Sequence, residues 1–232
     1  MEIYLIRHGT TAWNAAFRLQ GKTDTPLDPL GIEMARCTGE RFRELGITFD
    51  RVYSSPLSRA YRTAELVAGQ VDITTDPRLE ELGFGIQEGR CIRDLGPDES
   101  VPFRFFKNDP VQYDRLAPTV GAESLTALCE RTGDFLREVV EGRRNISGRN
   151  AGEEARKLPD RILISAHGAC NKGLLMHIRG DGNLSNFWEG GLQPNCGVDL
   201  IVYDPETGIY TVTGAGRIYY PEELLQRFRN LR

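Results

Sequence analysis

The chain of 232 residues is 40% hydrophobic and 27% charged, which predicts a globular α/β protein with a sizeable core and one domain that carries an insertion. A net charge of −4 argues against a general nucleic-acid binder. No apolar run approaches the roughly 18 residues of a membrane span, and the start, Met1–Gly9, lacks the features of a signal peptide. We therefore expect a cytoplasmic protein with no membrane or nucleic-acid partner.

The five cysteines are odd in number and widely spaced, and no C-x-x-C pair occurs. The sequence therefore predicts neither a zinc cluster nor a disulfide framework, and we expect no metal and no cofactor. One C-x5-R match, from Cys37 to Arg43, resembles the loop of a cysteine phosphatase. It follows no strand-like run and lies within a helical pattern, so we interpret it as a chance match.

Strand-like and helix-like segments alternate along the chain. In chain order, the predicted elements are a strand at 2–7, a helix at 29–45, a strand at 51–55, a helix at 56–68, a strand at 71–75, a helix at 125–140, a strand at 161–166, a helix at 169–178 and two strands, joined by a turn, over 197–215. Asp28 is expected to cap the first helix, and the polar segment 141–157 predicts an exposed loop or a helix extension. This alternation predicts a mostly parallel sheet with helices on both faces.

Polar clusters follow three of the predicted strands. Arg7-His8-Gly9 follows the first strand, the segment 54–65 follows the second, and His167-Gly168 follows the strand at 161–166. Because the carboxyl ends of parallel strands meet at one edge of a sheet, we expect His8, Arg59 and His167 to lie close together.

Two imidazoles and several guanidinium groups suit phosphoryl transfer. Neutral imidazole is nucleophilic near pH 7. A guanidinium holds phosphate oxygens two at a time and does not lose its proton. Departure of an alkoxide needs an acid, and the segment 78–90 offers Glu80, Glu81 and Glu88 for this task.

At these residues the chain closely resembles the histidine phosphatase superfamily, also called the phosphoglycerate mutase-like family. Five ordered blocks carry the resemblance: "IRHGTTAWN", "RLQGKTDTPLDPLG", "SSPLSRAYRTAE", "EELGFGIQEG" and "SAHG". It implies a three-layer sandwich over residues 1–232, with a helical insertion or lid at about 91–119. The catalytic residues that it implies are His8 as nucleophile, Arg7 and Arg59 as phosphate clamps, Glu81 as proton donor and His167 as second histidine. The residues that it implies for binding phosphate or lining the pocket are Asn14, Gln20, Gly21 and Gly168.

The resemblance favours the phosphatase branch, acting on a small phosphorylated metabolite. Mutases of the family carry a longer insertion with an Arg-Arg pair, which the segment 91–119 lacks; Arg143-Arg144 lies instead in the polar segment. A cofactor-dependent phosphoglycerate mutase and a non-catalytic phosphate-binding scaffold remain alternatives. The sequence does not indicate the oligomeric state or the substrate, whose specificity we expect in 91–119 and 180–195.

Some residues keep two interpretations. The aromatic span 102–113 suits either a lid, with Arg104 and Lys107 facing the substrate, or a small helical subdomain that buries Phe103 and Phe106. His177 suits packing better than chemistry, and Asn195 suits a turn better than the pocket.

Overall fold

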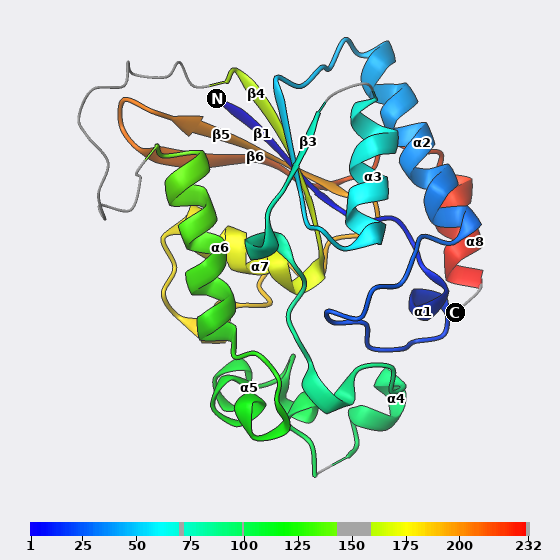
Figure 1. Cartoon of the computed structure of the whole chain (residues 1–232), viewed down its shortest axis with the longest axis vertical. Coiled ribbons are helices and arrows are strands. Elements are labelled where there is room, and N and C mark those ends of the chain that lie inside the picture. The colour runs from blue at the N-terminus through cyan, green and yellow to red at the C-terminus, as the bar shows by residue number, and fades with distance from the viewer. Residues whose placement is uncertain (70–71, 99, 143–158, 231–232) are drawn as a thin grey trace.

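A computed structural model describes residues 1–69, 72–98, 100–142 and 159–230 of the chain. Its centre is a six-stranded sheet in the order β3-β2-β4-β1-β5-β6 (Figure 1). The strands are β1 (Glu2–Arg7), β2 (Arg51–Ser54), β3 (Ile73–Thr75), β4 (Arg161–Ala166), β5 (Val198–Asp204) and β6 (Ile209–Arg217). The first four are parallel, whereas β5 and β6 are antiparallel to their neighbours. The prediction of a mostly parallel sheet is confirmed.

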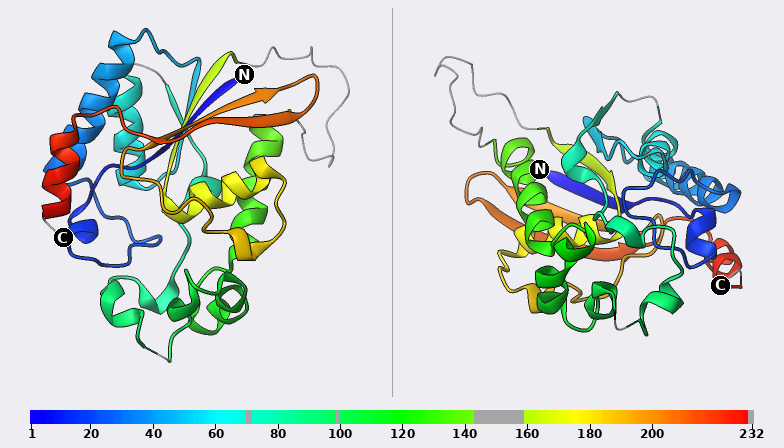
Figure 2. Two further views of the ribbon diagram at one scale, coloured as in Figure 1. Left: turned by 180° about the vertical axis from the view of Figure 1, so that it is seen from behind. Right: turned by 60° about the horizontal axis from the view of Figure 1, so that its bottom comes forward.

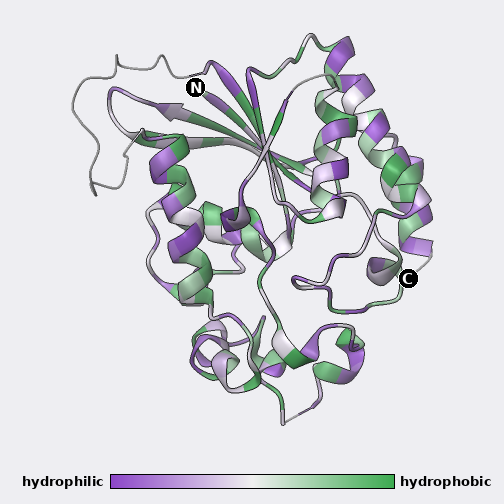
Figure 3. Ribbon diagram, viewed as in Figure 1, coloured by the Kyte–Doolittle hydropathy of each residue, from purple (hydrophilic) through white to green (hydrophobic). Residues whose placement is uncertain are grey.

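Helices cover both faces of the sheet. Figure 1 shows α2, α3 and α8 on one side of it and α6 and α7 on the other. Their bounds are α2 (Pro29–Glu44), α3 (Ser58–Ala68), α6 (Leu125–Val139), α7 (Gly168–Arg179) and α8 (Glu222–Asn230). Hydrophilic and hydrophobic stretches alternate along α2 and α6 (Figure 3), as expected for helices with one buried face.

Alternate side chains of β1 build the two cores. Tyr4 and Ile6 pack into a cluster with α2, α3 and α8, whereas Ile3 and Leu5 pack into a second cluster with α6 and α7. A strand that is buried on both faces needs consecutive apolar residues, as β1 has from Ile3 to Ile6. Such a central strand is held firmly, and so is the residue that follows it.

The start of α2 packs closely against the loop that follows β1. Asp28 accepts a hydrogen bond from Gly31 N at 2.7 Å, which confirms it as the N-cap. A Cβ atom on Gly9 would lie 2.6 Å from the carbonyl oxygen of Gly31, and one on Gly31 would lie 2.2 Å from that of Thr10. The two backbone segments can approach this closely because both positions are glycine. The contact fixes the backbone directly after His8.

Short helices fill the chain between Gly89 and Gly121. They are α4 (Ile92–Leu95), η3 (Pro102–Phe105), α5 (Pro110–Leu116) and η4 (Ala117–Val120), and they gather at one end of the molecule (Figure 2). Phe103 and Phe106 lie in a third apolar cluster that the segment shares with the start of α6. Phe103 and Phe106 are thus buried, as the subdomain interpretation expects, but in a cluster that also includes residues of α7 and not in a core of the segment's own.

The sequence did not predict every element. Further helices are α1 (Ala12–Ala15), η1 (Pro77–Leu79), η2 (Gly85–Gln87) and η5 (Leu184–Asn186). Residues 143–157 of the polar segment, which include Arg143-Arg144, lie outside the described residues. In the part of the chain that the structure describes, no helix combines the length and apolar character needed to cross a membrane.

Candidate active site

Two histidines that are 159 residues apart in sequence meet at the carboxyl edge of the sheet. β1 and β4 are parallel neighbours, with Arg7 opposite Ala166, so His8 and His167 are the first residues beyond paired strand ends. Their ring centroids lie 5.1 Å apart with the planes tilted by 59°. Both side chains are buried, with 3% and 0% exposure. The structure thus brings together the histidines that the motifs singled out.

The tautomer of His8 follows from one hydrogen bond. Its Nδ1 lies 2.7 Å from the carbonyl oxygen of Gly9. A carbonyl oxygen only accepts, so Nδ1 carries the proton and Nε2 keeps its lone pair. Burial, followed by the charges of Arg59 and Arg7, holds the pKa of His8 well below its ordinary value. His8 therefore presents a neutral, nucleophilic nitrogen.

Backbone carbonyls hold the guanidinium of Arg59 in place. Arg59 is fully buried, and it donates from Nη1 to Thr23 O at 2.9 Å and from Nη2 to Gly21 O at 2.7 Å. Burial lowers its pKa from the ordinary value, although a guanidinium stays charged at any pH a protein meets. Arg7 is fixed in a similar way, by a 2.7 Å bond from Nη1 to Gln193 O.

His167 is oriented by a residue that the sequence analysis missed. Its Nε2 lies 2.8 Å from Oγ of Ser55, the first residue after β2. Burial, and then the charge of Arg59, holds the pKa of His167 well below its ordinary value. The position of Ser55 at the start of the "SSPLSRA" block was the one signal available for its role.

Among the described residues, Nε of Arg59 and Nδ1 of His167 are examples of buried nitrogens at this site with no hydrogen-bond partner. A buried donor without a partner costs about 1–3 kcal/mol, and both atoms belong to groups that bind oxyanions well. This part of the chain therefore has the chemistry of an anion site.

Glu81 joins the site as the cap of α7. The N-cap of this helix is His167, whose side chain makes no capping bond. Oε1 of Glu81 instead accepts from the backbone N–H groups of Ala169 at 3.1 Å and Cys170 at 3.0 Å. A Cβ atom on Gly168 would lie at an ordinary contact distance of 3.5 Å from Glu81 Oε2 but only 2.9 Å from Leu192, so glycine here makes room for the leucine.

The two rival carboxylates have structural roles. Glu88 accepts from the backbone N–H groups of Lys22 at 3.0 Å and Thr23 at 2.9 Å, which shapes the loop after Gly21. Glu80 forms a 3.4 Å ion pair with Lys22. Among the described residues that line the cavity at this site, Glu81 supplies the one carboxyl group.

The predicted phosphate ligands Asn14 and Gln20 present amide nitrogens. Oδ1 of Asn14 accepts from Thr11 N at 3.1 Å in a capping box at the start of α1. Oε1 of Gln20 accepts from the hydroxyls of Thr11 and Thr25. Since the oxygens of both amides are occupied, their NH₂ groups remain as donors. Both side chains line the cavity.

Gly21 contributes backbone rather than an anion-binding side chain. Its φ of +60° lies in the left-handed region, and a Cβ atom would approach Glu88 Oε1 to 2.0 Å. Its carbonyl oxygen is the one that holds Arg59. Glycine is therefore required here to place that guanidinium.

A cavity of about 370 Å³ contains these groups. Arg7, His8, Arg59 and Glu81 line it together with Asn14, Gln20, Gly21 and Gly168, whereas the fully buried His167 is not among its lining residues but lies with its ring 5.1 Å from that of His8. The rest of the wall includes three cations, Arg18, Arg93 and Lys107, and six aromatic residues, Trp13, Phe17, Phe84, Phe103, Phe106 and Trp188. Both segments expected to set specificity, 91–119 and 180–195, contribute to it.

The structure separates the remaining sequence candidates from the cavity. Nε2 of His177, in the last turn of α7, lies 2.7 Å from Oε1 of Glu141. Asn195 is buried and donates from Nδ2 to the carbonyls of His8 at 3.0 Å and Gly9 at 3.2 Å, so it supports the loop from behind. Cys37 lies inside α2, which agrees with a chance C-x5-R match.

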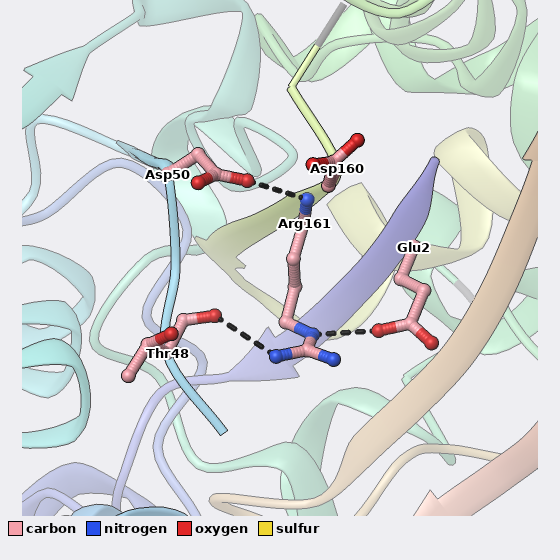
Figure 4. A pocket seen from close by; sticks show the side chains of 5 residues that line it. All are labelled: Glu2, Thr48, Asp50, Asp160 and Arg161. Carbon is pink, nitrogen blue, oxygen red and sulfur yellow. Dashed lines mark hydrogen bonds and ion pairs between the residues drawn. The ribbon is translucent and has the colours of Figure 1, made fainter. Parts of the chain in front are cut away.

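A second hollow, of about 420 Å³, lies at the amino ends of β1 and β4. Figure 4 shows Arg161 at its centre, with bonds to Asp50 at 2.8 Å from its backbone N and to Glu2 at 2.6 Å from its side chain. Through these contacts Arg161 connects β4 to β1 and to the loop before β2. None of the candidate catalytic residues lines this hollow.

Comparison with known proteins agrees with this geometry. The chain is 46% identical over 143 residues to a probable phosphoglycerate mutase GpmB of Yersinia pestis (strain Pestoides F), a match that spans 61% of this chain and 64% of that protein. The fold of the present chain is similar to that of Bacillus stearothermophilus YhfR, with a TM-score of 0.76 and 28% identity. The match covers 94% of this chain and 97% of the YhfR chain.

A putative α-ribazole-5′-P phosphatase of Escherichia coli K-12 is similar to the same extent, with a TM-score of 0.76, 25% identity, and 95% and 98% of the two chains covered. The sequence pattern of the histidine phosphatase superfamily (branch 1) matches residues 3–214, a range that includes each of the motif blocks. With these matches and the paired histidines in agreement, the chain belongs to that superfamily.

Proposed function

We propose that the protein is a phosphatase that hydrolyses phosphate monoesters of small metabolites through a phosphohistidine on His8. The observation that carries this proposal is the geometry of His8: its lone pair is on Nε2, and its ring is buried beside His167. Arg7 and Arg59 line the same cavity. A neutral nucleophile beside two fixed cations suits attack on a phosphate dianion.

In the first step, the Nε2 lone pair of His8 attacks phosphorus. A P–N bond forms while the ester P–O bond breaks, and the electron pair goes to the leaving oxygen. Glu81, whose carboxyl then carries a proton, gives that proton to the departing alkoxide. Arg7, Arg59 and His167 stabilise the charge on the three remaining oxygens.

In the second step, water attacks the phosphohistidine. Glu81, now a carboxylate, takes a proton from the water as its oxygen bonds to phosphorus. The P–N bond breaks, and His8 regains its lone pair. The products are one alcohol and one inorganic phosphate for each water consumed. The segment 91–119 forms part of the wall around the substrate and, in this proposal, acts as its lid.

A second candidate is a phosphoglycerate mutase, which the name of the Yersinia relative favours. A mutase must return the phosphoryl group to a hydroxyl and keep water away from the phosphohistidine. Incubation with 3-phosphoglycerate separates the two candidates. A phosphatase releases inorganic phosphate, whereas a mutase forms 2-phosphoglycerate, at a rate that rises when 2,3-bisphosphoglycerate is added.

The proposal is tested with His8→Ala, with His177→Ala as a control for loss of a histidine outside the cavity. A panel of phosphate monoesters that includes p-nitrophenyl phosphate, 3-phosphoglycerate and α-ribazole 5′-phosphate serves as substrate. We expect His8→Ala to lose at least about 1000-fold in kcat/KM, and His177→Ala to keep near wild-type activity. Rapid quenching of the wild type should trap an acid-labile, base-stable phosphoenzyme. Wild-type rates from His8→Ala contradict the proposal.

A further inference from the structure

We propose that Phe17 and Arg93 form a platform that binds an aromatic ring in the leaving group of the substrate. This inference rests on the proposed phosphatase function and adds a substrate class to it: phosphate monoesters of alcohols that carry an aromatic ring. Both residues line the cavity outside the catalytic group, and in this proposal they contact the non-reacting portion of the substrate.

The backbone of Phe17 is in a conformation that bulky residues seldom adopt. Its φ is +51°, and it lies directly after α1 and its C-cap. For a residue with a large side chain this region is strained, and such strain concentrates at functional sites. The surroundings hold it there: Phe17 O accepts from Ile92 N at 2.7 Å, and Arg18 forms a β-bridge with Cys91. The result is a half-buried ring that lines the cavity.

Arg93 lies over this ring. Its guanidinium carbon is 3.8 Å from the centroid of Phe17, well within the range of a cation–π contact. Arg93 comes from α4, in the segment 91–119, so the pair joins that segment to the loop after α1.

Further rings of the wall pack against one another. Phe106 packs edge-on against Phe84 at 5.2 Å and against Trp188 at 4.9 Å. The indole N–H of Trp188 donates to Phe106 O at 2.5 Å, so its polar atom is already satisfied within the protein. Leu192 lines the cavity while 44% exposed, which leaves apolar surface for a ligand to cover.

A strongly polar leaving group fits this wall less well. The carboxylate and hydroxyl of a small acid would lose water without gaining partners from aromatic rings. Three cations line this part of the cavity: Arg18 donates to Gly89 O at 2.6 Å, Arg93 lies over Phe17, and Lys107 is exposed to solvent. An aromatic ring instead gains offset-stacked or edge-to-face contacts with the wall.

The test compares leaving groups of similar chemistry, all alcohols: 2-phenylethyl phosphate, 2-cyclohexylethyl phosphate, glycerol 3-phosphate and 3-phosphoglycerate. For the wild type we expect 2-phenylethyl phosphate to have the highest kcat/KM. Phe17→Asn removes the ring but suits the left-handed backbone. It should raise KM for 2-phenylethyl phosphate by about tenfold with kcat little changed, because the ring binds ground and transition states alike. Its KM for glycerol 3-phosphate should stay within about twofold.

Arg93→Ala should act in the same direction, and Arg104→Ala is its matched control. Arg104 also stacks on a phenylalanine of the segment, Phe105, at 5.0 Å, but neither residue lines the cavity. Equal losses on all four esters from Phe17→Asn, or a wild type that prefers the cyclohexyl ester or 3-phosphoglycerate, overturn the platform and leave the phosphatase intact. Failure of the wild type to form a phosphoenzyme with any ester contradicts the proposed function itself.

Discussion

Glu81 combines two tasks in one carboxyl group. It caps α7 through bonds to two backbone N–H groups, and in the proposed mechanism it moves a proton to and from the reacting oxygen. Both tasks need the group at the same place, since the capped helix begins at Gly168 beside the nucleophile. A substitution that keeps the cap and removes the proton separates them.

Glu81→Gln keeps an amide oxygen where Oε1 accepts its bonds, but it has no proton to give to an alkoxide. We expect kcat/KM to fall by about 100- to 10,000-fold for glycerol 3-phosphate. For p-nitrophenyl phosphate the fall should be far smaller, because a nitrophenolate leaves without protonation. Thermal unfolding should be little affected, whereas Glu81→Ala should lose about 1 kcal/mol with the cap. Equal losses on the two esters contradict proton donation by Glu81.

At the scale of residues, the sequence predicted groups that directly follow strands and missed those that depend on conformation. His8, Arg59 and His167 could be found because a polar residue after an apolar run marks the end of a strand. The platform residue Phe17 could not, because a φ of +51° is a property of the fold and not of the amino acid. Nor does the sequence indicate that Ser55 bonds to a histidine 112 positions away.

At the scale of elements, α7 and the loop 180–195 form one unit. The nearly buried Lys172 donates from Nζ to Glu189 O at 2.7 Å, and Asn171 donates from its side chain to Gln193 at 2.7 Å. Burial lowers the pKa of Lys172 from its ordinary value. The loop tied down in this way supplies Trp188 and Leu192 to the cavity wall.

Lys172→Met should loosen that loop with little loss of volume in the core. The lost charge-assisted bond is worth about 1.5–3 kcal/mol, so we expect the loop to be cleaved faster in limited proteolysis and KM for aromatic esters to rise several-fold. Arg179→Met is the matched control, because Arg179 contacts the same residue through a more exposed 3.4 Å ion pair. If the two variants behave alike, Lys172 does not hold the loop.

Long periodic elements were predictable, and short ones were not. α2 was predicted to within one residue because its apolar positions recur at helical spacing and Asp28 and Pro29 mark its start. α3 begins at Ser58 rather than at the predicted Pro56, because Leu57 has an extended backbone with ψ of 131°. The short helices between residues 92 and 120 owe their conformation to their shared core, and no local pattern indicates such packing.

At the scale of the whole molecule, the sheet gathers residues from distant parts of the chain. The rule that carboxyl ends of parallel strands meet was enough to predict that His8 and His167 converge. The strand order β3-β2-β4-β1-β5-β6 and the antiparallel pair at one edge were beyond the sequence pattern. Short apolar strands carry no signal for which neighbour they pair with, because that choice depends on how the helices pack.

Because the imidazoles of His8 and His167 are buried beside Arg7 and Arg59, the free energy of unfolding depends on pH. Burial, and then the charge of Arg59, holds the pKa values of His8 and His167 well below their ordinary value. Below about pH 6.5 the unfolded chain therefore takes up protons that the folded protein refuses. The stability contributed by these groups is present above that pH and is lost as pH falls, by up to about 1.4 kcal/mol per pH unit for each histidine.

We therefore expect the free energy of unfolding of the wild type to fall more steeply between pH 7 and pH 5 than that of a His8→Asn/His167→Asn variant, measured by urea denaturation. Inorganic phosphate should restore much of the loss in the wild type and little in the variant. A bound anion offsets the two guanidinium charges, so the imidazoles can accept protons while the protein stays folded. Parallel pH profiles would contradict the lowered pKa values of the two histidines, and equal recovery with phosphate in both proteins would contradict an anion site that these histidines share with Arg59.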